Sequence, residues 1–184
     1  VLEEHRDVVV LVDEAYVDFG GVSADTLLKE YDNLVVVRTL SKSRALAGLR
    51  VGYALGSPNL ISGLCCVRDS INSYTVDRVA MAGVRAALED EDYFQTIRRR
   101  VMATRERTAD TLRKLGFTVL PSQANFLFLS KPGKTGKELL DGLRAKGILV
   151  RWWDDAPIRD WLRVSIGTEQ DMEALCRALE ELTQ

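Results

Sequence analysis

The chain has 184 residues, of which 46% are hydrophobic and 28% charged, and its formal net charge is -2 at pH 7. These values are typical of a globular protein with a sizeable core, and they argue against a nucleic-acid or membrane partner, because no strong charge attracts either. Three cysteines, two of them adjacent, match neither a zinc site nor a disulfide framework, so we expect a reducing, cytoplasmic location. The polar start without an initiator methionine predicts a fragment or processed product that carries no signal peptide.

Three short apolar runs in the first half of the chain predict β-strands. Their continuous apolar character is typical of strands that are covered on both faces, which favours parallel pairing. The expected strands span residues 8–13, 33–40 and 51–56. Helical patterns alternate with them, at residues 23–31, 57–69, 76–90 and 91–116.

The second half predicts a smaller unit of helices and antiparallel strands. We expect one or two strands within residues 117–130 and further strands at 148–153 and 161–167. Helices are expected at 135–147 and at 168–184, the latter capped by Thr168. The sequence therefore predicts an α/β protein in two parts, residues 1–90 with a largely parallel sheet and residues 91–184 with an antiparallel α+β fold.

The segment VRTLSKSRALAGLRVGYALG, residues 37–56, places a lysine in an unusual setting. Lys42 follows the second predicted strand between two serines, and Arg50 follows eight residues later. Asp13 ends the first predicted strand. Because open α/β sheets bind ligands at the carboxyl ends of their strands, one site would hold an amine, a carboxylate, hydroxyls and a guanidinium. Without these neighbours, a lysine on a solvated loop would be the plainer interpretation.

These groups match the functional parts of pyridoxal 5'-phosphate. An arginine fork helped by Ser and Thr hydroxyls binds a phosphate. A lysine with a lowered pKa forms a Schiff base with an aldehyde. A carboxylate pairs with a protonated pyridine nitrogen. The residues around Lys42 therefore indicate pyridoxal 5'-phosphate as the cofactor.

The segments DEAYVDF and RTLSKSRALAGLRVGYALG resemble the fold-type I pyridoxal-phosphate enzymes of the class I and II aminotransferase family, and within it the histidinol-phosphate aminotransferases. SQANFLFL, GILVRWW and WLRVSIGT match in the same order and spacing. The resemblance implies the C-terminal portion of such an enzyme. Residues 1–90 would belong to the large cofactor-binding domain and hold part of its mixed sheet, and residues 91–184 would form the small α+β domain. The N-terminal half would then supply a phosphate-binding glycine loop and the residue that stacks on the cofactor ring.

The resemblance also implies a role for each residue around the lysine. Lys42 would bind the cofactor covalently and, once displaced by substrate, would move the proton between the substrate Cα and C4'. Asp13 would keep the pyridine nitrogen protonated, and Tyr16 would hydrogen-bond the ring hydroxyl oxygen. The phosphate would be held by Thr39, Ser41 and Arg50.

In the second part the resemblance implies substrate-binding residues. Arg163 would bind the substrate carboxylate or the phosphate of histidinol phosphate, and Arg151 would be a second anion-binding residue. Asn125 would lie near the site. Ile71 stands where many family members carry an aromatic residue, and Tyr74 lies nearby, so the exact substrate stays open.

The implied activity is pyridoxal-phosphate-dependent transamination in histidine biosynthesis, carried out by a homodimer on small amino and keto acids. Another class I and II aminotransferase, a threonine-phosphate decarboxylase and a non-catalytic dimerising fragment remain the alternatives. The only histidine, His5, gives no support for a metal site or a Ser-His triad. The basic run at residues 98–114 is interrupted at helical spacing, which favours a solvated helix face over RNA binding.

Overall fold

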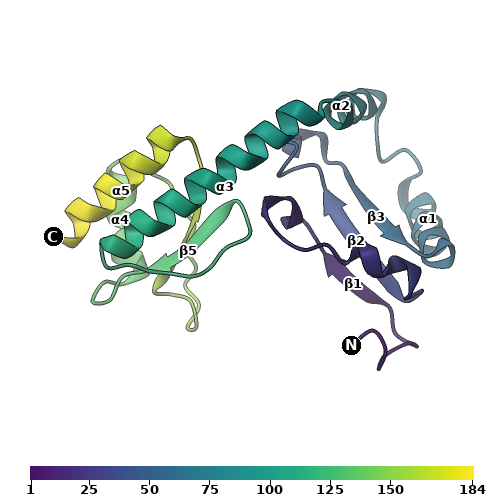
Figure 1. Cartoon of the computed structure of the whole chain (residues 1–184), viewed down its shortest axis with the longest axis horizontal. Helices are drawn as coiled ribbons and strands as arrows, with labels where there is room; N and C mark the ends of the chain where they lie inside the picture. Colours follow the sequence, from purple (N-terminus) through teal and green to yellow (C-terminus); the bar gives the residue numbers. More distant parts are fainter. The chain divides into compact units, whose positions relative to one another are not determined.

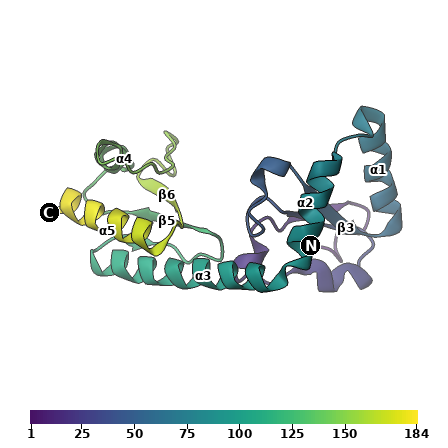
Figure 2. The same cartoon turned by 90° about the horizontal axis from the view of Figure 1, so that it is seen from above.

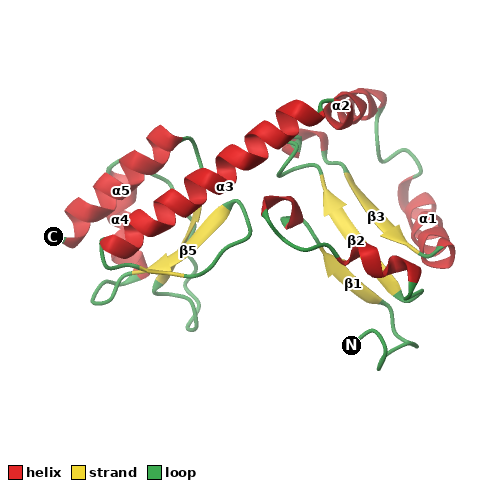
Figure 3. Ribbon diagram, in the orientation of Figure 1, coloured by secondary structure: helices red, strands yellow, loops and turns green.

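The computed structural model describes all 184 residues, and the chain divides into two compact units, Val1–Thr96 and Ile97–Gln184 (Figure 1). Each unit has a three-stranded sheet of its own, so the chain has the predicted α/β architecture (Figure 3). The boundary falls inside the long helix α3, Glu91–Lys114. No helix combines the length and the apolar character that crossing a lipid bilayer requires.

The first unit contains every strand and helix predicted for it, with ends shifted by a few residues. Its strands are β1 (Val10–Asp13), β2 (Leu34–Thr39) and β3 (Gly52–Gly56). Three short 3-10 helices lie between the strands. η1 (Val17–Phe19) and η2 (Ala24–Lys29) lie between β1 and β2, and η3 (Ala47–Leu49) lies between β2 and β3. The α-helices before α3 are α1 (Pro58–Asn72) and α2 (Arg78–Glu89). Each begins where the sequence supplies a helix start, a proline for α1 and the capping carboxylate of Asp77 for α2.

The sheet of the first unit has the order β1-β2-β3, and only one of its two pairings is parallel. β1 and β2 run parallel, with Asp13 opposite Val37. β3 runs antiparallel to β2, with Gly52 opposite Thr39, so the sheet is mixed, as the family resemblance implies, and the parallel pairing that the apolar runs favour is wrong for β3. The connection explains the difference, because residues 40–51 form turns and a single short 3-10 helix, without the crossover helix that joins parallel neighbours.

The two parallel strands differ in how deeply their side chains are buried. β2 lies at the centre of the sheet, and Leu34, Val35 and Val36 are buried as predicted. β1 is an end strand, and the prediction that both its faces are covered is wrong, since Leu11 is 58% exposed. Leu11 lies on a face of the sheet that this chain leaves open, and an apolar run alone does not show whether a face is covered.

The second unit is an antiparallel sheet covered by helices, as predicted. The strands are β4 (Thr118–Val119), β5 (Phe126–Ser130) and β6 (Trp161–Ser165), and the helices beside α3 are α4 (Gly136–Ala145) and α5 (Glu169–Thr183). Alternate residues of the strands enter the core, among them Leu129 and Leu162. They pack with helix residues that include Leu112 of α3 and Leu179 of α5. Figure 2 shows these two helices side by side.

Residues 148–153 do not form the predicted strand. Only Arg151 pairs with β6, in an isolated bridge opposite Arg163. The next residue, Trp152, turns its indole N–H to the carbonyl oxygen of Arg159, at 2.6 Å. This contact closes a loop and ends the ladder after one pair, although the apolar run itself favours a strand.

Candidate functional site

The ends of β1 and β2 bring the predicted residues of the first unit to one edge of its sheet. Because these strands are parallel, both leave the sheet at the same edge, after Asp13 and Thr39. The antiparallel β3 begins at that edge, with Gly52 opposite Thr39. We call this region the carboxyl edge. The predicted residues that it gathers are Asp13, Tyr16, Thr39, Ser41, Lys42 and Arg50.

The side chain of Lys42 is exposed and faces an aromatic ring. Its Nζ lies 5.8 Å from the centroid of the Tyr16 ring, within the range of a cation–π contact. No ion pair of the chain includes Lys42, Asp13 or Arg50. The Asp13 carboxylate accepts the amide of Ala15 at 2.9 Å, so it is oriented by its own backbone. The carboxyl edge therefore presents an amine, a carboxylate and a guanidinium that no opposite charge neutralises.

Local hydrogen bonds fix the backbone of residues 40–51, which we call the lysine loop. The buried Leu40 donates its amide to Val51 at 3.1 Å, and its carbonyl accepts the amide of Leu46 at 3.0 Å. Thr39 Oγ1 accepts the amide of Ser41 at 3.1 Å. The Thr39 hydroxyl proton remains for another acceptor, so the threonine can both shape the turn and donate to a ligand.

Two residues of the lysine loop have backbone conformations that side chains disfavour. Ala45 has φ 57° and Arg50 has φ 56°, both in the left-handed region. Each costs about 1–2 kcal/mol relative to the right-handed conformation. Ser43 opposes this strain from a buried position, since its hydroxyl donates to the carboxylate of Asp18. Strain held by surrounding contacts is a frequent property of functional sites.

Glu14, which the sequence analysis did not single out, is the centre of a polar network beside the carboxyl edge. The residue is 7% exposed, and its carboxylate accepts the Ser23 hydroxyl at 2.8 Å, the Ala24 amide at 2.6 Å and Arg38 Nε at 2.9 Å. Arg38 also donates to Ser23 Oγ at 2.6 Å and to Asp25 at 2.7 Å. Every hydrogen bond here has a charged donor or acceptor, which makes it stronger than a neutral one.

This network fixes the strand ends that carry the predicted residues. Burial alone would lower the pKa of the Arg38 guanidinium, but hydrogen bonds with Tyr53, Glu14 and Asp25 raise that pKa above its ordinary value. Arg38 precedes Thr39 and Glu14 follows Asp13, so their ion pair ties the last residues of β2 and β1 together. The sequence carries one signal of it, because an arginine within the run VVVRT needs a buried partner.

In the second unit, two arginines lie opposite each other on neighbouring segments. Arg163 and Arg151 exchange backbone hydrogen bonds of 2.8 and 3.0 Å, which places both side chains on one face of the sheet. Like charges directly opposite each other are destabilising, and neither arginine has a carboxylate partner. Arg163 Nε is buried without a hydrogen-bond partner, and its guanidinium lies 4.8 Å from the ring centroid of Phe126. This pair can bind an anion, which would satisfy the buried Nε–H and neutralise the paired charges.

Asn125 directly precedes β5, the strand that pairs with β6 and Arg163. Its carbonyl accepts the amide of Ile166, which follows β6, at 2.8 Å. The buried Arg105 of α3 holds the preceding residue, donating to the carbonyl of Ala124 at 3.0 Å. These bonds hold the backbone of Asn125 in place on both sides.

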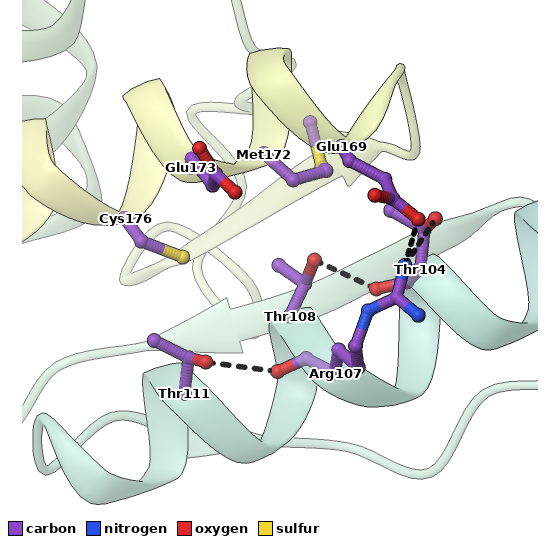
Figure 4. A pocket seen from close by; sticks show the side chains of 8 residues that line it. All are labelled: Thr104, Arg107, Thr108, Thr111, Glu169, Met172, Glu173 and Cys176. Atoms are coloured by element: carbon purple, nitrogen blue, oxygen red, sulfur yellow. Dashed lines mark hydrogen bonds and ion pairs between the residues drawn. The ribbon is translucent and has the colours of Figure 1, made fainter.

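A cavity of about 200 Å³ between α3 and α5 lacks the features of a reactive site (Figure 4). Its threonines bond to their own helix, with Thr108 donating to the carbonyl of Thr104 and Thr111 to that of Arg107. Arg107 pairs with Glu169 across the opening. The threonines and the Arg107–Glu169 pair thus have partners within the two helices, so we interpret this cavity as a gap between packed helices.

Comparison with known proteins identifies the family of the chain. A family model described as aminotransferase class I and II matches residues 1–179. The chain is 50% identical over 181 residues to the histidinol-phosphate aminotransferase of Clostridium acetobutylicum and 53% identical over 180 residues to that of Chromohalobacter salexigens. Each match covers 98% of this chain and 51% of the relative. The chain thus spans about half the length of these curated relatives.

A solved structure has the same fold. The histidinol-phosphate aminotransferase of Sinorhizobium meliloti, determined in complex with pyridoxal-5'-phosphate, matches with a TM-score of 0.83 and 28% sequence identity. The match covers 97% of this chain and 49% of that one. The predicted fold-type I architecture is therefore confirmed.

Proposed function

Because the chain belongs to the class I and II aminotransferase family, we propose that the intact protein is a pyridoxal-phosphate-dependent histidinol-phosphate aminotransferase. It would convert histidinol phosphate and 2-oxoglutarate to imidazole-acetol phosphate and L-glutamate. The observation that carries this proposal is the identity of 50–53% to histidinol-phosphate aminotransferases over 98% of the chain. The carboxyl edge supports it with the residue types that this chemistry requires.

The donor set at the carboxyl edge fits pyridoxal 5'-phosphate. When bound, this cofactor supplies an aldehyde that takes up the substrate amino group and a ring that accepts electrons. The Arg50 fork and the hydroxyls of Ser41 and Thr39 would hold the phosphate. Asp13, which no cation of the chain neutralises, would hold the proton of the ring nitrogen. Tyr16 would donate its hydroxyl to the ring oxygen.

Lys42 would have two tasks in this site. Its Nζ would bind the cofactor aldehyde, and after the substrate amine has displaced it, the free amine would take the proton from the substrate Cα. The absence of an ion-pair partner supports both tasks, because a paired ammonium would first have to leave its carboxylate. The exposed position of Lys42 beside the ring of Tyr16 gives a ligand access to it.

The second unit would supply the groups that bind the substrate. We assign the anionic ends of the substrate to Arg163 and Arg151, and a supporting position to Asn125. The buried, unpartnered Arg163 Nε supports this assignment. In this proposal Val1–Thr96 is part of the large cofactor-binding domain and Ile97–Gln184 is the small domain.

The intact protein would act as a homodimer in the cytoplasm. The free state of Cys65, Cys66 and Cys176 agrees with a reducing compartment. Exposed apolar side chains of the first unit, such as Leu11 and Val67, agree with a surface that further protein covers.

Steady-state assays of the intact protein with different amino donors test the proposed reaction. With 2-oxoglutarate as acceptor, histidinol phosphate should give a higher kcat/KM than aromatic amino acids or aspartate. A preference for an aromatic donor would indicate another aminotransferase of the family. Release of carbon dioxide from threonine phosphate would indicate the decarboxylase instead.

We expect Asp13→Asn to lower kcat of the intact enzyme about 10- to 150-fold while the fold is retained. The amide cannot hold the ring nitrogen in its protonated form, and a charge-assisted hydrogen bond is worth about 1.5–3 kcal/mol. Asp7→Asn is the matched control, because the same change is made at an exposed aspartate before β1. Turnover near the wild-type value in Asp13→Asn would remove Asp13 from the cofactor site.

We expect Arg163→Met to lower kcat/KM for histidinol phosphate about 10- to 150-fold, mainly through KM, because one charge-assisted contact to the substrate is lost. Cofactor attachment to Lys42 should stay unchanged. Arg144→Met, at an exposed arginine of α4, serves as the control. An unchanged KM in Arg163→Met would show that the substrate anion binds elsewhere.

A further inference from the structure

Arg44 joins the lysine loop to the place where α2 ends and α3 begins. A single residue separates these helices, and we call residues 87–94 the α2–α3 corner. Arg44 Nη1 donates to the carbonyl of Ala87 at 2.7 Å, in the last turn of α2. Its Nη2 donates to the carboxylate of Glu91 at 2.9 Å, in the first turn of α3. One guanidinium therefore spans the joint between two helices.

A third contact of Arg44 lies on an aromatic ring. The guanidinium carbon is 3.6 Å from the centroid of the Phe94 ring, and Phe94 is buried. The Arg44 side chain itself is only 13% exposed. A planar fork can stack on a ring and donate to two acceptors at once, whereas a lysine ammonium cannot make this set of contacts. The site is therefore specific for arginine.

The lysine loop meets α2 at a second point. A Cβ atom at Gly83 would lie 2.7 Å from Leu49 Cδ1, so the leucine side chain lies directly on the helix backbone there. Gly83 and Ala87 are four residues apart and lie on the same face of α2. The lysine loop thus packs on one face of α2 through two residues, Leu49 and Arg44.

We infer that Arg44 is a positioning residue, which holds the lysine loop on the α2–α3 corner and so fixes the backbone from which the Lys42 side chain extends. The inference rests on the proposed function for the role of Lys42. The turn after Lys42 includes the left-handed Ala45, whose strain works against this conformation unless outside contacts hold it. Arg44 lies between Lys42 and Ala45 and supplies such contacts, in addition to the Ser43–Asp18 hydrogen bond.

Hydrogen exchange in the cofactor-free intact protein tests whether Arg44 holds the loop. Arg44→Ala should raise the exchange rates of the Ala45 and Leu46 amides about tenfold or more, because their hydrogen bonds close the turn. The amides of Val35 and Val36 in β2 should exchange at wild-type rates. An Arg44→Ala variant with wild-type exchange at Ala45 and Leu46 would overturn the inference.

Trapping with pyridoxal 5'-phosphate and borohydride tests the consequence for Lys42. The initial rate at which the reduced adduct forms on Lys42 should fall roughly tenfold or more in Arg44→Ala, because the amine is less well placed. Arg44→Lys keeps the charge without the fork and should give an intermediate rate. Arg85→Ala is the control, since Arg85 also pairs with a glutamate at 2.9 Å but is 82% exposed. This variant should leave the amide exchange rates and the trapping rate unchanged.

The two measurements separate this inference from the proposed function. Failure of the wild-type protein to form the adduct on Lys42 would contradict the proposed function, while the exchange rates would still decide whether Arg44 holds the loop. Equal trapping rates in wild type and Arg44→Ala would contradict the inference alone. If Arg44→Ala does not fold, Arg44→Lys and Phe94→Leu provide the same two comparisons, because each removes part of the same contact set.

Discussion

Replacing Lys42 by alanine in the intact protein is expected to lower the transamination rate by a factor of about 10²–10⁴ or more, the range that loss of a general base costs. In the proposed site Lys42 both binds the cofactor aldehyde and moves the substrate Cα proton, and no second amine of the carboxyl edge can replace it. Stability should change little, because the Lys42 side chain is exposed and makes no ion pair. Turnover and thermal unfolding, measured on the same preparation, check both statements.

Lys29→Ala is the matched control for this variant. Lys29 is also an exposed lysine of the first unit, and it lies at the end of η2. We expect its loss to leave turnover at the wild-type value. Equal activity of Lys42→Ala and Lys29→Ala would contradict the assignment of Lys42 as the reactive lysine.

The largest loss of stability is expected from Glu14→Ala. This change leaves the Arg38 guanidinium without its most buried partner, and breaking a buried ion pair costs about 3–5 kcal/mol. All three tryptophans lie in the second unit, so the loss should appear in the hydrogen exchange of β2 amides rather than in tryptophan fluorescence. Glu14→Gln keeps the shape and part of the hydrogen bonding, and it should lose less.

Glu89→Ala provides a close control for the Glu14 variant. Glu89 also accepts an arginine Nε at 2.9 Å, but both side chains of that pair are mostly exposed, so we expect a change of at most about 1 kcal/mol. Equal losses for Glu14→Ala and Glu89→Ala would contradict the view that the buried network fixes the ends of β1 and β2.

The apolar runs predicted which segments form strands, but not where each strand lies in the sheet or in which direction it runs. A run such as VVVLV records that a strand is apolar, whether it lies at the centre of a sheet or at its end, so the exposure of Leu11 does not follow from it. The direction of β3 depends on the geometry of residues 40–51, which periodicity does not describe. At residues 148–153, where a strand was predicted, the indole of Trp152 instead closes a loop with the Arg159 carbonyl seven residues later, which the apolar run does not indicate.

The sequence predicted the residues of the candidate site whose side chains can themselves react with or bind a ligand. Lys42, Asp13 and Arg50 stand out because an amine, a carboxylate and a guanidinium follow strand ends at a specific spacing. Glu14 and Arg44 act through partners distant in the sequence, Arg38 and Phe94, and only the fold brings them together. Residues that position others therefore escape sequence reasoning more easily than residues that react.

The central claim is that Lys42 is the lysine that binds the cofactor, and peptide mapping tests it most directly. The intact protein is incubated with pyridoxal 5'-phosphate, reduced with borohydride and digested, and the modified peptide is identified by mass spectrometry. We predict a single modified lysine, Lys42, in the peptide that contains the sequence TLSKSR. A stable adduct on another lysine, with Lys42 unmodified, would contradict the account.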